Sequence, residues 1–83
     1  MMARRVLVTG AGGYLGRQVV ERLAELPPAQ RPELLLAHDL RAPAQPLPGV
    51  EYANGDIRSP ELGEMIARHR IDTVVHQIGR AHV

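Results

Sequence analysis

Arg5–Gly16 reads Arg-Val-Leu-Val-Thr-Gly-Ala-Gly-Gly-Tyr-Leu-Gly and decides how the rest of the chain folds. Its first apolar residues, Val6–Val8, show no alternation, which is typical of a parallel strand covered on both faces. Glycines then recur at three-residue intervals, at Gly10, Gly13 and Gly16. Apolar residues at helical spacing follow, namely Leu15, Val19, Val20, Leu23 and Leu26. The stretch therefore predicts a buried strand, a glycine-rich turn and an amphipathic helix.

The glycine-rich turn has the form that a dinucleotide requires. A pyrophosphate is bound by N–H donors, and a helix N-terminus supplies them together with a favourable dipole. Gly10 would permit the tight turn, Gly13 the close approach of the phosphates, and Gly16 the close packing of helix on strand. The alternative is a tight strand-to-helix turn that binds no ligand.

Composition limits the class of protein. The chain has 83 residues, which is short for a complete doubly wound domain. It has no cysteine, and its formal net charge is +1, so neither disulfides nor a strong attraction to nucleic acid is expected. No segment is apolar enough to span a membrane, and no export signal precedes the first strand. We expect a cytoplasmic protein with no nucleic-acid or membrane partner and no metal site.

The remaining segments alternate between strand-like and helical patterns. Pro27-Pro28 ends the first helix, which begins at Tyr14, and Ser59-Pro60 starts the second. Three further strands are predicted at residues 33–38, 50–54 and 71–76, although 33–38 is also compatible with a buried helical turn. The fold class is α/β: the N-terminal half of a Rossmann-like doubly wound parallel sheet, with the order β-α-β-β-α-β.

Asp39 follows the second predicted strand. In a dinucleotide fold, an acid about twenty residues beyond the glycines accepts hydrogen bonds from the ribose hydroxyls. A carboxylate there would repel a 2′-phosphate, so Asp39 favours NAD over NADP, while Arg41 weakens that preference. The alternative is that Asp39 is an ordinary turn residue.

The glycine motif also carries a family resemblance. Thr9–Gly16 is similar to the Thr-Gly-x-x-Gly-x-x-Gly motif of short-chain dehydrogenases/reductases, and Tyr14-Leu15-Gly16 resembles the extended branch, the NAD-dependent epimerase/dehydratase family. Gly55-Asp56-Ile57 resembles the family segment that contacts adenine, although a plain Gly-Asp turn would look the same. The cofactor-binding residues that follow are Gly10, Gly13, Tyr14, Leu15, Gly16, Asp39, Asp56 and Ile57.

The resemblance implies a reaction for the parent enzyme. Family members transfer hydride between a nucleotide-sugar or similar hydroxyl substrate and the nicotinamide, with a Tyr-x-x-x-Lys pair as base. The tyrosines here are Tyr14 and Tyr52, and the sequence has no lysine. We therefore expect no catalytic residue in this chain, which alone would be inactive, and a homodimeric parent is compatible with the resemblance. The alternative is a non-catalytic NAD(P)-binding sensor or complex subunit of the same fold.

The last seven residues depart from the family pattern. Val74-Val75-His76 resembles the family's Val-Val-His-Leu-Ala-Ala, but Gln77–Val83 does not continue it. Ile78–Val83 also back-translates to DNA that resembles a common sequencing-library adapter. The expected division is an incomplete NAD(P)-binding Rossmann domain at residues 1–76 and a non-native tail at 77–83.

Overall fold

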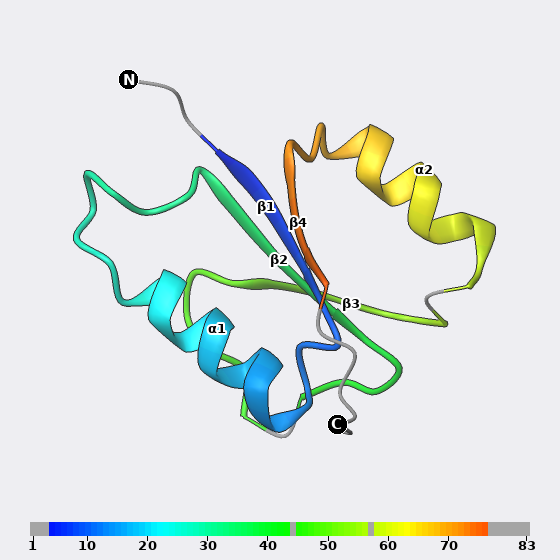
Figure 1. The fold of residues 1–83 in the computed structure, drawn as a ribbon, viewed down its shortest axis with the longest axis horizontal. Coiled ribbons are helices and arrows are strands. Elements are labelled where there is room, and N and C mark those ends of the chain that lie inside the picture. The colour runs from blue at the N-terminus through cyan, green and yellow to red at the C-terminus, as the bar shows by residue number, and fades with distance from the viewer. Residues whose placement is uncertain (1–3, 44, 57, 77–83) are drawn as a thin grey trace.

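A single parallel sheet organises the chain. The structure is a computed structural model, and it describes residues 4–43, 45–56 and 58–76. The four strands lie in the order β3-β2-β1-β4, and α1 and α2 lie on opposite sides of the sheet (Figure 1). In chain order the elements are β1 (Arg5–Thr9), α1 (Tyr14–Ala24), β2 (Leu34–Asp39), β3 (Glu51–Asn54), α2 (Pro60–Arg68) and β4 (Thr73–His76). The predicted fold class is confirmed.

β1 is the central strand, and its side chains are buried on both faces. Val6 and Val8 pack under α1 with Leu35 and Ala37 of β2. Leu7 points to the opposite face and is fully buried. Because β1 pairs in parallel with β2 on one side and with β4 on the other, its backbone groups are bonded in both directions. This double coverage explains the uninterrupted apolar run in the sequence.

The helix α1 presents a different face to the sheet from the one expected. Gly16 and Val20 are its buried residues, whereas the side chain of Leu15 is 58% exposed. The expectation that the apolar face begins at Leu15 was wrong. Gly16 takes the place against the turn because a glycine permits the closest contact there. Leu15, about 100° around the helix from Gly16, is thereby turned away from the sheet.

The helix α2 starts where predicted but is held loosely. Ser59 caps it, because its side-chain oxygen accepts a hydrogen bond from the N–H of Glu61 at 3.2 Å, and Pro60 opens the first turn. None of the residues of α2 is fully buried. β4, which follows it, is the edge strand beyond β1, and Val74 on β4 is 51% exposed.

Arg5 joins three segments at the amino edge of the sheet. Its Nε donates to the carbonyl of His69 at 2.5 Å, just after α2. Its Nη1 pairs with the Glu33 carboxylate at 2.9 Å, just before β2. Its backbone N–H donates to Asp72 Oδ2 at 3.1 Å, just before β4. These contacts fix the amino ends of the strands, so that their carboxyl ends come together at the opposite edge.

Candidate functional site

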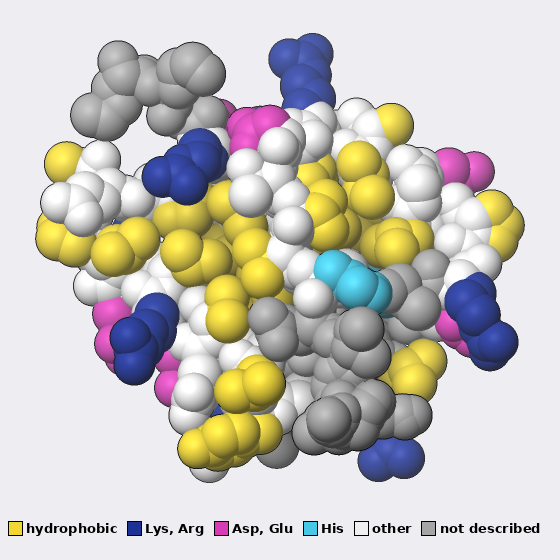
Figure 2. Space-filling view, viewed as in Figure 1, with side chains coloured by type: hydrophobic (Ala, Val, Ile, Leu, Met, Phe, Trp, Pro, Cys, Tyr) yellow, Lys and Arg dark blue, Asp and Glu magenta, His cyan; other side chains and the backbone are white. Residues whose placement is uncertain are grey.

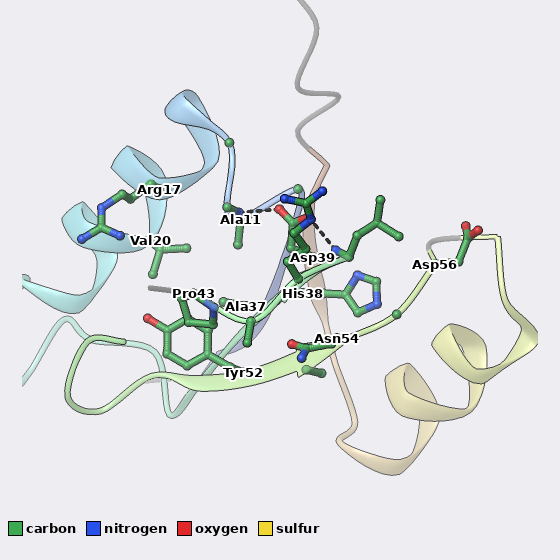
Figure 3. A pocket seen from close by; sticks show the side chains of 18 of the residues that line it. Ala11, Arg17, Val20, Ala37, His38, Asp39, Pro43, Tyr52, Asn54 and Asp56 are labelled. Atoms are coloured by element: carbon green, nitrogen blue, oxygen red, sulfur yellow. Dashed lines mark hydrogen bonds between the residues drawn. The ribbon is translucent and has the colours of Figure 1, made fainter. Parts of the chain in front are cut away.

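A cavity of about 910 Å³ lies at the carboxyl edge of the sheet (Figure 3). Its wall is formed by the glycine-rich turn after β1, the end of β2 and the proline-containing loop beyond it, and the end of β3. In Figure 3, Arg17 and Asp56 lie at opposite ends of the cavity, with His38 and Asp39 between them. In open parallel sheets, this edge is where ligands bind.

The glycine-rich turn has the geometry expected of Gly10 and Gly16. Gly10 has a φ of +69°, a left-handed conformation that glycine adopts without strain. A Cβ built on Gly16 would overlap the carbonyl oxygen of Gly10, so the helix packs against the turn at a distance that only glycine allows. Gly13 lines the cavity and is the N-cap of α1, without a side-chain cap.

The first turn of α1 offers backbone donors rather than side chains. The bond from the N–H of Arg17 to the carbonyl of Gly13, at 2.8 Å, is the start of the helical ladder. The N–H groups of Tyr14, Leu15 and Gly16 precede that ladder and lie at the positive end of the helix dipole. The side chain of Tyr14 is 79% exposed, and neither it nor Leu15 lines the cavity. Any contribution from these two residues to anion binding would therefore come from the backbone.

Asp39 contacts the glycine-rich turn directly. Its Oδ2 accepts a hydrogen bond from the N–H of Gly12 at 2.5 Å, and its Oδ1 accepts one from the N–H of Leu40 at 2.5 Å (Figure 3). A Cβ on Gly12 would lie 2.8 Å from Asp39 Oδ2, so a side chain there would displace the carboxylate. Sequence reasoning missed Gly12, because the three-residue spacing of the motif passes over it. The signal was the Gly12-Gly13 doublet, one glycine more than that spacing uses.

Asp56 lies on the cavity wall and is bound by its own loop. Its Oδ1 accepts the backbone N–H of Arg58 at 2.8 Å, and its Oδ2 pairs with Arg58 Nη2 at 3.2 Å. The hydrogen bonds from the Arg58 side chain, reinforced by the bond from its backbone N–H, hold the pKa of the Asp56 carboxyl below its ordinary value. The same pairing raises the pKa of the Arg58 guanidinium. Ile57, predicted beside Asp56, lies outside the described residues.

Three cavity-lining residues were not predicted as site residues. His38 is buried beside Asp39. The hydroxyl of Tyr52 on β3 accepts the N–H of Leu47 at 2.9 Å and so holds the proline-containing loop against the sheet. Arg17 lies one turn into α1 and pairs with Glu21 at 2.9 Å. The sequence gave no local signal for these roles, because each depends on segments that the fold brings together.

His76 lies at the carboxyl end of β4, and the structure gives it a hydrogen-bonding role. Its Nδ1 is 2.6 Å from Oγ1 of Thr9, its register partner on β1. This agrees with the prediction that His76 is a packing or hydrogen-bonding residue at a strand end. Within residues 4–43, 45–56 and 58–76, no three histidine or acidic residues are arranged to hold a metal ion.

The sequence is similar to proteins of one family along nearly its whole length. Residues 6–83 match the NAD dependent epimerase/dehydratase family. Over 80 residues the chain is 42% identical to a dTDP-6-deoxy-L-talose 4-dehydrogenase (NAD(P)(+)) of Kitasatospora kifunensis, in an alignment covering 90% of this chain and 23% of that protein. Over 78 residues it is 42% identical to a UDP-glucose 4-epimerase of Azospirillum brasilense, with 90% and 21% covered. An uncharacterized protein of Mycobacterium tuberculosis is 37% identical over 75 residues, with 86% and 19% covered.

These alignments involve a small part of each relative. The chain spans about a fifth of the length of the curated proteins named above. No solved structure matches it significantly. In the part of the chain that the structure describes, no helix has the length and apolar character needed to cross a membrane.

Proposed function

The chain belongs to the NAD-dependent epimerase/dehydratase family, and we propose that it binds the adenosine diphosphate half of NAD within a longer enzyme. The observation that carries the proposal is the meeting of the glycine-rich turn with the Asp39 carboxylate at one end of a large cavity. The turn supplies donors for a diphosphate, and the carboxylate supplies acceptors for hydroxyl groups.

Each part of the cofactor has candidate residues in the cavity. The diphosphate would lie against Gly13 and the N-terminal turn of α1, where the backbone N–H groups and the helix dipole favour an anion. The adenosine ribose would be bound by Asp39. The adenine would lie toward Asp56, and the neighbouring Ile57 is proposed as its apolar wall on the family resemblance alone.

NAD is proposed over NADP on electrostatic grounds. The phosphate that distinguishes NADP sits on the ribose hydroxyl that Asp39 would bind, so two negative groups would meet there. Arg41 also lines the cavity and offers a positive charge that opposes this discrimination. A relative whose name includes NAD(P)(+) shows that the family accommodates both cofactors, and we therefore expect a preference rather than an exclusion.

The complete protein is proposed to be an epimerase, dehydratase or dehydrogenase that acts on a nucleotide-sugar or a similar hydroxyl substrate. The support is the relatives named UDP-glucose 4-epimerase and dTDP-6-deoxy-L-talose 4-dehydrogenase. The cofactor would accept and return hydride at its nicotinamide ring. The residues of this chain would bind and orient the adenosine end, and they include no Tyr-x-x-x-Lys sequence for the base.

Calorimetric titration of the full-length protein with NAD and with NADP tests the proposal. We expect binding of both, with NAD the tighter ligand. Activity is then assayed with a panel of nucleotide-sugars. Binding of NAD without turnover on any hydroxyl substrate would favour a sensor or complex subunit, whereas the absence of NAD and NADP binding would refute the proposed function.

A further inference from the structure

We propose that Asp39 is a positioning residue for the glycine-rich turn, in addition to its proposed contact with ribose. Its hydrogen bond to Gly12 would hold the turn in the conformation that receives a diphosphate, before any ligand arrives. This inference rests on the proposed function for its ligand, but its structural part concerns only Asp39 and Gly12. A residue that merely bound ribose would have no effect on a ligand that lacks ribose.

The turn has few other attachments. Within it, the N–H of Gly13 donates to the carbonyl of Gly10 at 3.2 Å. Toward β2, the N–H of Ala11 donates to the carbonyl of His38 at 3.0 Å, and the N–H of Gly12 donates to Asp39 Oδ2 at 2.5 Å. The last of these is the shortest, and its acceptor is charged, which makes it the strongest kind of attachment in this set. Glycine-rich backbone loses more conformational freedom on ordering than other backbone, so such attachments matter here.

The carboxylate can serve the turn and the ribose together. Each oxygen of Asp39 accepts one backbone N–H, Oδ2 from Gly12 and Oδ1 from Leu40. A carboxylate has about four acceptor positions in all, so two remain for the ribose hydroxyls. The two N–H groups also fix the orientation of the carboxylate. The turn and the ribose site are therefore coupled through one side chain.

Two uncharged substitutions separate the hydrogen bond from the charge. Asp39→Asn retains an oxygen that can accept from Gly12, and Asp39→Ala retains none. Loss of the negative charge would favour an anionic ligand equally in both. The test ligand is inorganic pyrophosphate, which has the diphosphate but no ribose, and its affinity for the full-length protein is measured by NMR titration. We expect Asp39→Ala to bind it about fivefold more weakly than Asp39→Asn, the ratio given by one net hydrogen bond.

The same samples report on the turn directly. In protein labelled with ¹⁵N-glycine, the Gly12 amide should exchange slowly with solvent in the wild type and in Asp39→Asn, and rapidly in Asp39→Ala. Asp72 supplies a matched control, because its carboxylate also accepts a backbone N–H, that of Arg5, at the opposite edge of the sheet. Asp72→Ala and Asp72→Asn should bind pyrophosphate equally and leave the Gly12 amide unchanged.

The outcomes distinguish this inference from the proposed function. Equal pyrophosphate affinity in the two Asp39 variants, or a Gly12 amide that stays protected in Asp39→Ala, would overturn the positioning role even if NAD binds. Failure of the wild type to bind NAD would refute the proposed function, while loss of Gly12 protection in Asp39→Ala would still establish that Asp39 orders the turn.

Discussion

Oγ1 of Thr9 and Nδ1 of His76 lie 2.6 Å apart, joining the last residue of β1 to the last residue of β4. Thr9 is 2% exposed, so its hydroxyl has almost no access to water as an alternative partner. The bond lies directly before the turn that begins at Gly10. It therefore secures the edge strand to the central strand at the point where the cavity begins.

Thr9→Val tests this bond, because valine keeps the branched shape and removes the hydroxyl. The expected loss in the free energy of unfolding is about 1 kcal/mol, the typical net value of one hydrogen bond, measured by urea denaturation. Thr73→Val is the control, since the Thr73 hydroxyl bonds to the exposed, sequence-adjacent carboxylate of Asp72 and should contribute less. Equal effects of the two substitutions would contradict a special role for Thr9.

Asp39→Ala should weaken NAD binding. The residue would lose a charge-assisted hydrogen-bond acceptor, which corresponds to ~1.5–3 kcal/mol of binding free energy. Isothermal titration calorimetry on the full-length protein measures this change, with Asp72→Ala as a carboxylate control outside the cavity. An unchanged dissociation constant would remove Asp39 from the ribose site.

Arg5→Met should loosen the amino edge of the sheet. Methionine retains much of the apolar stem but cannot donate to the carbonyl of His69 or pair with Glu33. We expect a loss of about 1 kcal/mol in the free energy of unfolding, mainly from the bond to His69, because ion pairs with exposed partners contribute little. Arg68→Met on α2 is the comparison, and an equal loss there would show that the contacts of Arg5 are unimportant.

The Asp56 carboxyl should titrate below the ordinary value of 3.8, because Arg58 stabilises its charged form. A pKa lowered by folding stabilises the protein above the unfolded value, and that stabilisation disappears as the pH falls through the folded value. Carbon-detected NMR of the side-chain carboxyl measures the pKa. In Arg58→Gln it should return toward 3.8, and an unaltered pKa in that variant would assign the shift to another cause.

The native sequence is proposed to end its agreement with this chain at or just after His76. Amplifying and sequencing the source gene beyond the codon for His76 tests this. We expect codons for small apolar residues in place of Ile78–Val83, followed further on by a Tyr-x-x-x-Lys sequence. Genomic DNA that encodes Ile78–Val83 would refute the non-native tail.

Local patterns in the sequence were sufficient for most of the fold. The apolar run before Gly10 and the glycine spacing predicted β1, the turn and α1, and Ser59-Pro60 predicted the start of α2. The last strand was expected from Ile71 but begins at Thr73. Ile71 is instead used to close the preceding helix, since its N–H donates to the carbonyl of Ile66 at 3.0 Å.

What the sequence could not predict depends on contacts between distant segments. Gly12 and Asp39 are 27 residues apart, and the short distance between them appears only when β1 and β2 pair. The exposure of Leu15 has the same origin, because helical periodicity defines an apolar stripe without fixing which residue of the first turn faces the strand. Figure 2 shows hydrophobic side chains across the middle of one face and arginine and acidic side chains around its rim, a distribution that only the assembled fold reveals.

The position of β1 in the middle of the sheet also determines the order in which the chain can assemble during synthesis. β1 can pair with β2 as soon as Asp39 has left the ribosome, whereas its other edge waits for β4, which ends at His76. At about 5–20 residues per second, that interval is on the order of seconds. During it, the nascent chain exposes an unpaired central strand, and the glycine-rich turn is attached to β2 before its far side has formed.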